Sequence, residues 1–425
     1  MKEKIKSVLL FLLIVTSLWQ SYLLAYSQPK FSPIHFATYV ENELQGSKKE
    51  ESAFFFPTSL VLHFGENKQT VLNPDHAFYE KIFYDKISKR KFESFQLVSL
   101  EAEALLALQR SSRGVEIKFE QLVPVPILQN MMQLENNYTL QSEKIKSIWI
   151  GSNEGNDEVN VYFFAASNNV YQSINADFLL DDIEQYLTFG QYLNEQVNYT
   201  SVDTIHGAFY LPEKEIPSAE ITMSVNEYTA ESFINSLFVD PSTSRSFPQT
   251  DGSQIYTDGK RGLQIDENGN WMSFTNPVAP TQQSSTAYAN LATAIKFVNQ
   301  HGGWNGTYRL YRFPEQTEEM FRFVSYYNTL PIIQTEESIF GLVQVQMEEN
   351  VVTSYERSML EWDEEISRSK YMLSGGEELT ALINDYSEPI VTVFPAYEVV
   401  RETENVTFIP RWAVEKEDGT FDFIE

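Results

Sequence analysis

The sequence predicts an α+β protein, in which a single N-terminal transmembrane helix precedes a three-domain mixed α/β ectodomain with mainly antiparallel sheets. Residues 7–25 contain no charged side chain, and about 20 apolar residues cross a ~30 Å hydrocarbon core. Beyond them, short segments with alternating apolar residues are separated by Gly, Asn and Pro, which is typical of antiparallel strands. A chain of 425 residues with 42% hydrophobic residues can form two or three cores.

The first segment resembles a membrane anchor with a cytoplasmic start. Lys2, Lys4 and Lys6 precede the apolar stretch, and basic residues favour the cytoplasmic side of a span. This predicts a cell-membrane protein with an extracytoplasmic ectodomain. The alternative is a cleaved secretory signal, with a cleavage site at residues 25–27. The apolar stretch continues past Trp19 to Leu24, which is long for a signal and favours the uncleaved anchor.

We assign residues 1–27 to the cytoplasmic stub and transmembrane helix, 28–52 to a polar tether and 53–205 to an N-terminal ectodomain domain. A hairpin is expected over 60–72, because Gly65 begins a turn between two alternating segments. Further extended segments are expected at 94–100, 114–126 and three between 146 and 174. Helices are expected at 75–89 with Asp75 as N-cap, 101–109, 127–135 and 178–190.

The remaining chain is assigned to a middle domain, residues 206–283, and a C-terminal domain, residues 284–425. Strands are expected at 220–226, 307–313, 320–327, 339–346, 390–400 and 405–415. Two or three further strands are expected over 254–257 and 262–274, with a tight turn at 266–269. Helices are expected at 230–238 with Thr229 as cap, 284–300, and 377–384 with Ser374 as cap. A short helix followed by a hairpin occurs in both domains, which suggests that they are related to each other.

The composition excludes several classes of function. The net charge is −28 at pH 7, and a body this acidic repels the phosphates of nucleic acids. The absence of cysteine excludes disulfides, thiol chemistry and a lipid-modified N-terminal cysteine. We therefore expect an exported, soluble body held together by apolar cores.

The ectodomain sequence contains no assembled catalytic or metal motif, so we predict neither an enzyme nor a cofactor. The five histidines are scattered, without ligand spacing. Asp251, Asp258 and Asp266 precede glycines and suggest hairpin turns more than calcium loops. The acidic run at 361–365 could supply paired carboxylates, but a solvated helix face is the simpler interpretation.

One constellation in the transmembrane helix points to a partner. At about 100° per residue, Thr16, Ser17, Gln20 and Ser21 fall within about 140° of one face. Ser17 and Ser21 form a small-xxx-small pair that permits close helix approach, and Gln20 can hydrogen-bond to another helix. We predict that these four residues bind a partner; the alternative is an anchor that tolerates polar residues near its outer end.

An alternative function is an extracytoplasmic module that binds a cell-wall ligand. Aromatic residues on the expected strands, including Tyr308, Tyr311, Tyr326 and Tyr327, could stack on sugars. The competing interpretation is that these side chains fill the faces of the sheets. An anchored hydrolase is a third possibility, but it lacks a nucleophile or a metal set.

Three segments together resemble the YycH family of Gram-positive bacteria: FPTSLVLHFGENKQTVLNP from Phe56, GVEIKFEQLVPVPILQ from Gly114, and IWIGSNEGNDEVNVYFFAASNNVYQSINADF from Ile148. The resemblance covers essentially the whole chain. It implies a three-domain ectodomain whose last two domains are related to each other and to the companion protein YycI. It also implies an accessory regulator of the WalK (YycG) sensor histidine kinase, which governs cell-wall metabolism, with membrane helices in contact.

Overall fold

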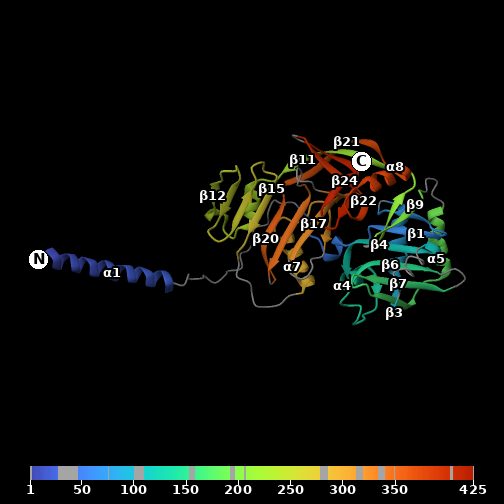
Figure 1. Ribbon diagram of the computed structural model, residues 1–425, viewed down its shortest axis with the longest axis horizontal. Coiled ribbons are helices and arrows are strands. Elements are labelled where there is room, and N and C mark those ends of the chain that lie inside the picture. The colour runs from blue at the N-terminus through green and yellow to red at the C-terminus, as the bar shows by residue number, and fades with distance from the viewer. Residues whose placement is uncertain are drawn as a thin grey trace. The chain divides into compact units, whose positions relative to one another are not determined.

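The computed structural model describes residues 2–26, 46–74, 76–99, 110–152, 158–191, 197–204, 207–277, 286–312, 319–333, 340–348, 350–402 and 405–424. The chain forms two compact units, residues 1–40 and residues 41–425. The described residues of the first unit form the helix α1 (Lys2–Tyr26). The second contains two large sheets, coloured blue to green and yellow to red in Figure 1.

The first sheet lies in the N-terminal half of the second unit. Its strands within the described residues are β1 (Ser59–Gly65), β2 (Lys68–Leu72), β3 (Lys91–Val98), β4 (Arg113–Pro124), β5 (Gln133–Leu134), β6 (Lys144–Ser152), β7 (Val159–Ala165), β8 (Val170–Ala176), β9 (Tyr199–Thr204) and β10 (Gly207–Pro212). Their order is β10-β9-β2-β1-β4-β6-β7-β8-β3-β5. The pairs are antiparallel except β3 with β5.

Short helices cover one face of this sheet, namely α2 (Ala77–Phe83), η2 (Ile87–Lys89), α4 (Val125–Met131) and α5 (Leu180–Gln191). The longest of them, α5, packs against β1, β4 and β6 (Figure 1). It buries Ile183, Tyr186 and Leu187 against apolar residues such as Ile117 of β4. The amphipathic pattern of α5 therefore explains why one face of the sheet is closed to water.

The second sheet has its own set of described strands: β11 (Ile216–Glu227), β12 (Arg245–Pro248), β13 (Gln254–Thr257), β14 (Gly262–Ile265), β15 (Trp271–Thr275), β16 (Thr307–Arg312), β17 (Glu319–Tyr327), β18 (Leu330–Ile333), β19 (Leu342–Glu348), β20 (Val351–Ser358), β21 (Leu360–Leu373), β22 (Ile390–Arg401), β23 (Asn405–Lys416) and β24 (Phe421–Ile424). The order is β12-β13-β14-β15-β20-β19-β17-β18-β22-β23-β11-β21, with β16 beside β17 and β24 beside β23. The pairs are antiparallel except β18 with β22.

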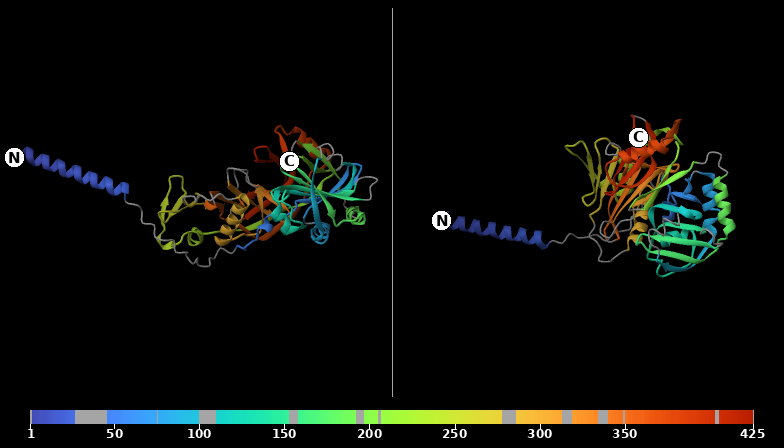
Figure 2. Two further views of the ribbon diagram at one scale, coloured as in Figure 1. Left: turned by 90° about the horizontal axis from the view of Figure 1, so that it is seen from below. Right: turned by 45° about the vertical axis from the view of Figure 1, so that its right-hand side comes forward.

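Four helical segments accompany the second sheet: α6 (Ala230–Leu237), η3 (Pro241–Thr243), α7 (Ala287–Gln300) and α8 (Gly376–Asp385). α7 lies on β17, β19 and β20 and buries Leu291, Ile295 and Val298 (Figure 2). Thr286 caps this helix by accepting a hydrogen bond from the amide of Ala289. The apolar face of this capped, amphipathic helix thus packs into the core on one face of the second sheet.

Two junctions connect the sheets within the second unit. At one, η1 (Glu51–Phe54) inserts the Phe54 ring 4.5 Å from the Trp304 ring and 5.1 Å from the Phe323 ring. At the other, Phe209 of β10 packs in one cluster with Leu379 of α8 and Trp412 of β23. Apolar burial at both points stabilises the contact between the sheets.

The fold-class prediction is confirmed as mixed α/β with mostly antiparallel sheets and one apolar N-terminal helix. The hairpin over 60–72, the strand at 114–126 and the three strands between 146 and 174 are present as β1–β2, β4 and β6–β8. Thr229 caps α6, as predicted. The predicted helix at 101–109 lies outside the described residues.

Other predictions at this level were wrong. The helix expected over 75–89 is α2 followed by η2, and His76 is the N-cap, while Asp75 lies outside the described residues. The helix expected over 127–135 is present as α4, but its bounds differ. It begins two residues earlier, with Pro126 in its first turn, and ends at Met131, because residues 133–134 pair with β3 as β5. Gly375, not Ser374, is the N-cap of α8.

Candidate functional site

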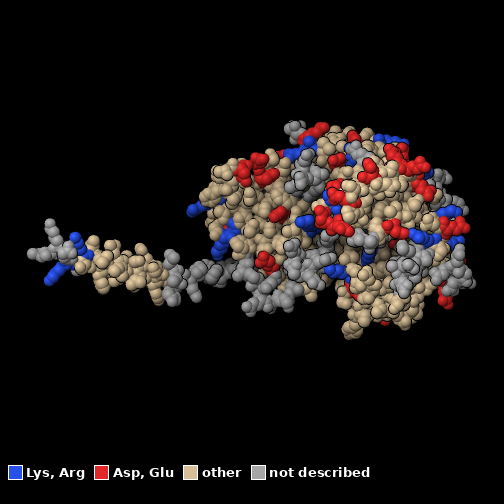
Figure 3. Space-filling view, in the orientation of Figure 1, with Lys and Arg blue, Asp and Glu red and all other residues tan. Residues whose placement is uncertain are grey.

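The helix α1 has the length and composition of a membrane span. Lys4–Tyr22 is a 19-residue stretch with a mean hydropathy of 1.5, and none of it is buried against the rest of the chain. Large apolar side chains are exposed along it, including Leu10, Phe11 and Trp19. In Figure 3 the helix surface lacks Lys, Arg, Asp and Glu except near its beginning. An uncleaved anchor and a cleaved signal share this length and composition.

The four predicted partner-binding residues, Thr16, Ser17, Gln20 and Ser21, all lie on α1 with exposed side chains. Thr16 Oγ1 donates a hydrogen bond to the carbonyl of Leu12 at 2.8 Å, so this hydroxyl is satisfied by its own helix. No such bond is present for the Gln20 amide among the described residues. A primary amide in an apolar span needs a partner, because hydrocarbon offers no hydrogen bonds.

The last part of the predicted tether attaches to helix α7 and to the residues that follow this helix. Ser47 N donates to the Trp304 carbonyl at 2.9 Å, and Trp304 N donates to the Ser47 carbonyl at 3.0 Å. Asn299 completes the attachment: its Oδ1 accepts from Lys49 N at 3.0 Å, and its Nδ2 donates to the Lys49 carbonyl at 2.9 Å. The chain therefore enters the second unit at the C-terminal end of α7.

A charged network is buried in the first sheet. Glu116 of β4 is 3% exposed; Tyr210 donates to its Oε2 at 2.6 Å, and His63 Nε2 lies 3.4 Å from the same oxygen. Burial raises the pKa of Glu116, but Lys118 and the bonds from His63 and Tyr210 outweigh burial and lower it to about 2. The ammonium of Lys118 lies 4.9 Å from the centroid of the Tyr210 ring. Glu116 thus fixes the position of Tyr210, whose ring packs against Lys118.

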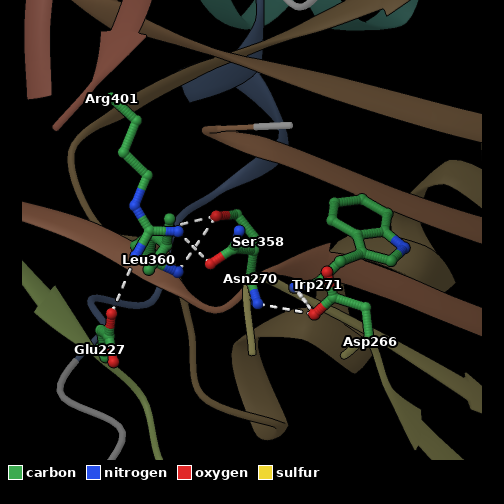
Figure 4. Close-up of polar contacts among 7 residues, drawn as sticks. All are labelled: Glu227, Asp266, Asn270, Trp271, Ser358, Leu360 and Arg401. Atoms are coloured by element: carbon green, nitrogen blue, oxygen red, sulfur yellow. Dashed lines mark hydrogen bonds and ion pairs between the residues drawn. The ribbon is translucent and has the colours of Figure 1, made fainter. Parts of the chain in front are cut away.

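A second polar cluster joins the turn between β14 and β15 to the ends of β11 and β22 (Figure 4). Asp266 Oδ1 accepts hydrogen bonds from the amides of Asn270 and Trp271 at 2.6 and 3.0 Å. The Arg401 guanidinium donates to Asn270 Oδ1 and to Glu227 Oε1. The carboxylate of Asp266 therefore shapes a turn, as the sequence predicted.

Two family comparisons account for most of the chain. The family model described as "YycH protein, C-terminal domain" matches residues 206–424, which is more than half of the chain. The one described as "YycH protein, N-terminal domain" matches residues 3–187. The chain belongs to the YycH family. Neither description names a catalytic activity.

Individual relatives agree with this family membership. The two-component system WalR/WalK regulatory protein YycH of Bacillus subtilis (strain 168) is 21% identical over an alignment of 443 residues, which covers 97% of this chain and 94% of that protein. The crystal structure of YycH from Bacillus subtilis superposes with a TM-score of 0.70 at 17% identity and covers 89% of this chain and 98% of that one. At this identity, the superposition shows that the fold is shared.

In this YycH-family chain, other residues that the sequence suggested as candidates make hydrogen bonds within the fold. The acidic run at 361–365 lies in β21 and not on a helix face, so that prediction was wrong. Two of its carboxylates accept hydrogen bonds from tyrosines distant in the chain: Tyr228, just after β11, donates to Glu361, and Tyr327 of β17 donates to Glu365. His301 is buried, with Nδ1 donating to the Ser236 carbonyl at 2.7 Å.

The four tyrosines considered for sugar stacking do not form a shared exposed platform. Tyr308 and Tyr326 are each 5% exposed and belong to the sheet interior. Tyr311 donates to Glu415, and Tyr327 packs with Trp362 and Phe408. The interpretation that these residues fill sheet faces agrees with their burial.

Sequence reasoning missed the network around Glu116. A signal existed in the alternation of β4, where Glu116 and Lys118 occupy successive positions on one face between apolar residues. Charged residues at both of these positions are unusual when the strand is central to a sheet. Their partners His63 and Tyr210 are distant in sequence, so the network could not be assembled from spacing.

Proposed function

We propose that this chain is a non-enzymatic, membrane-anchored regulator of a WalR/WalK two-component system that acts on the WalK sensor kinase through α1. The family membership and the printed name of the Bacillus subtilis relative support the WalR/WalK assignment. The apolar stretch Lys4–Tyr22 supports the anchor. The Lys-rich start supports a cytoplasmic N-terminus and an extracytoplasmic second unit.

The observation that carries the helix mechanism is the polar face of α1. Gln20 offers an amide to a neighbouring helix, and Ser17 and Ser21 allow that helix to approach closely. An anchor that only holds a protein in the membrane does not require such a face.

The physical action of this face is a shift in the kinase equilibrium. A helix that packs better against one kinase state favours that state only by the difference between its two affinities. A difference of about 1.4 kcal/mol changes the ratio of states about tenfold. A few hydrogen-bonded and closely packed residues are sufficient for that difference.

We further propose that the second unit pairs with a YycI-like protein. The family resemblance supports this partner, as it supports relatedness between the middle and C-terminal domains. For the domain limits we keep residues 53–205, 206–283 and 284–425; the two matched family regions, which divide between residues 187 and 206, support the first of these limits.

The proposal is tested by crosslinking in intact membranes. A photoreactive residue at position 17 or 20 should capture WalK, whereas the same residue at Val15 or Leu18, on the opposite face of the helix, should capture at least fivefold less. The intact mass of the chain recovered from membranes shows whether residues 1–27 are retained. Equal capture from both faces, or a chain that lacks residues 1–27, contradicts the helix mechanism.

A further inference from the structure

A cleft of about 470 Å³ lies between the two sheets within the second unit. Its walls come from β1, β2, β4, β6, β9 and β10 on one side and from β16, β17, β18, β22 and β23 on the other. Phe209 and Trp412 of the second junction line it, as does Arg309 of β16, the strand that contacts η1. Its volume lies in the range of small-molecule sites, about 300–1,000 Å³.

The charge of the cleft is opposite to that of the whole chain. The chain has 31 Lys and Arg against 59 Asp and Glu. Among the described lining residues, the cations are Lys118, Lys146 and Arg309, whereas Glu415 is the single carboxylate. Glu415 accepts a hydrogen bond from Tyr311 at 3.0 Å. In a concave, partly enclosed space, this excess of cations creates a local positive potential that attracts anions.

A local irregularity of the sheet brings Lys146 into the lining. The register between β6 and β7 shifts between Ile145 and Ser147, and that between β4 and β6 shifts after Lys118. A bulge turns a side chain away from the strict alternation of a strand, and bulges are frequent beside functional sites. Ile145 and Ser147 are buried on either side, while Lys146 reaches the cleft.

The two lysines disfavour each other when the cleft holds no anion. Lys146 reaches solvent, but the surrounding protein atoms of the concave wall lower its pKa, the positive charge of Lys118 lowers it further, and the negative charge of Glu116 offsets part of this lowering. Lys118 is held in place by the Tyr210 ring and by a hydrogen bond to the Ala208 carbonyl. An ammonium has three donors, so Lys118 retains capacity for a ligand. An anion between the two groups would relieve their repulsion.

Part of the opposite wall is apolar, beside Arg309 of β16 and Glu415 of β23. Leu330 and Pro331 of β18, Val393 and Phe394 of β22, and Trp412 of β23 line it. A purely inorganic anion would leave this surface in contact with water, whereas a ligand with an apolar body would cover it. The walls therefore suit a molecule with two chemically different ends.

We propose that this cleft binds a small anionic molecule with an apolar body, whose carboxylate or phosphate lies between Lys118 and Lys146. The apolar body packs against β18, β22 and β23. Because both sheets contribute, the ligand bridges them and stabilises their contact. This site does not depend on the helix mechanism proposed above.

The test is calorimetric titration of the full chain in lipid nanodiscs, with empty nanodiscs as the blank. The probes are 1-naphthyl phosphate and 1-naphthaleneacetate, and the uncharged control is 1-naphthaleneethanol. We expect saturable binding of at least one anion, at least about tenfold tighter than the uncharged probe, since charge-assisted hydrogen bonds are the strong ones. Comparison of the phosphate with the carboxylate identifies the preferred head group.

Matched variants locate the binding. Lys146→Gln should weaken the preferred anion about tenfold, and Lys146→Arg should retain most of the affinity. Lys370→Gln removes the same charge from an exposed strand position of β21 outside the cleft, and should leave binding unchanged. The inference is overturned if neither anion binds saturably at millimolar concentration, if the uncharged probe binds as tightly, or if Lys146→Gln behaves as Lys370→Gln does.

Discussion

The carboxylate of Glu116 shows how one buried charge organises a region of this fold. It accepts a hydrogen bond from Tyr210 and lies beside His63 and Lys118, which together lower its pKa to about 2 despite burial. Removing one member of a buried charge pair leaves the other uncompensated, which is more costly than losing the bond itself. The Glu116 network therefore contributes to the stability of the first sheet.

We predict that Glu116→Gln lowers the free energy of unfolding by about 3 kcal/mol at pH 7. The folded pKa is about 2 and the ordinary value is 4.5. The stabilisation by the charged carboxylate is therefore complete above about pH 4.5 and is lost as the pH falls toward 2. Urea unfolding of the detergent-solubilised chain between about pH 7 and pH 2 measures how the free energy of unfolding depends on pH. The variant should show a shallower decline than the wild type, and parallel curves would refute this role.

Roles assigned to single residues from the sequence were correct where the partner is close along the chain, and a role was missed where the partner is distant. Thr229 and Asp266 act locally, within a few positions of their partners, and were assigned from spacing alone. Glu116 was missed because Tyr210 lies 94 positions away along the chain. Local hydrogen-bond chemistry is visible in a sequence, whereas a tertiary network is not.

Among the elements, α1 carries the functional prediction. Replacing both Ser17 and Gln20 by Leu removes the close-approach site and the amide while leaving the span apolar. We expect the double variant to lose most of its effect on WalR-dependent transcription, and Gln20→Leu alone to reduce it about fivefold, since such bonds contribute on the order of 1 kcal/mol. Val15→Leu on the opposite face is the control. If the double variant supports wild-type WalR-dependent transcription at an equal amount of chain in the membrane, the polar face of α1 is not required.

The segment at 46–49 is the element through which the anchor is connected to the second unit. A Cβ at Gly46 would lie 2.2 Å from the Gly302 carbonyl oxygen and 2.5 Å from Trp304 N, so the backbone must move. We predict that Gly46→Val costs about 1–3 kcal/mol and speeds amide exchange at Ser47 and Trp304. Gly262→Val, where nothing lies within 4 Å, should leave both amides protected. Unchanged exchange in Gly46→Val would show that the attachment tolerates displacement.

Elements with strong local patterns were predicted well, and those defined by their neighbours were not. α7 has a clear apolar face and a Thr cap, and the hairpin of β1 and β2 has a Gly turn. The acidic run in β21 has neither an apolar stripe nor a turn signal, so its strand conformation comes from pairing with β11. Tertiary pairing overrides weak local preference in such segments.

On the scale of the whole molecule, the second sheet is assembled from distant parts of the chain. β11 pairs with both β21 and β23, and Thr222 reaches Thr407 across 185 positions. Alternation predicts that strands exist, but it does not predict which strands become neighbours. This is why the cleft between the sheets, with Lys118 and Trp412 on opposite walls, could not be anticipated from the sequence.

In the proposed mechanism, α1 does more than hold the chain in the membrane: its polar face contacts WalK. The most direct measurement replaces residues 7–25 of the full chain by an unrelated apolar span of equal length, keeping Lys2, Lys4 and Lys6 and the entire second unit. WalR-dependent transcription is then compared with that of the wild type and of a deletion strain, at equal membrane levels of the chain. We expect output within about twofold of that of the deletion strain. Wild-type output from the exchanged helix would contradict it.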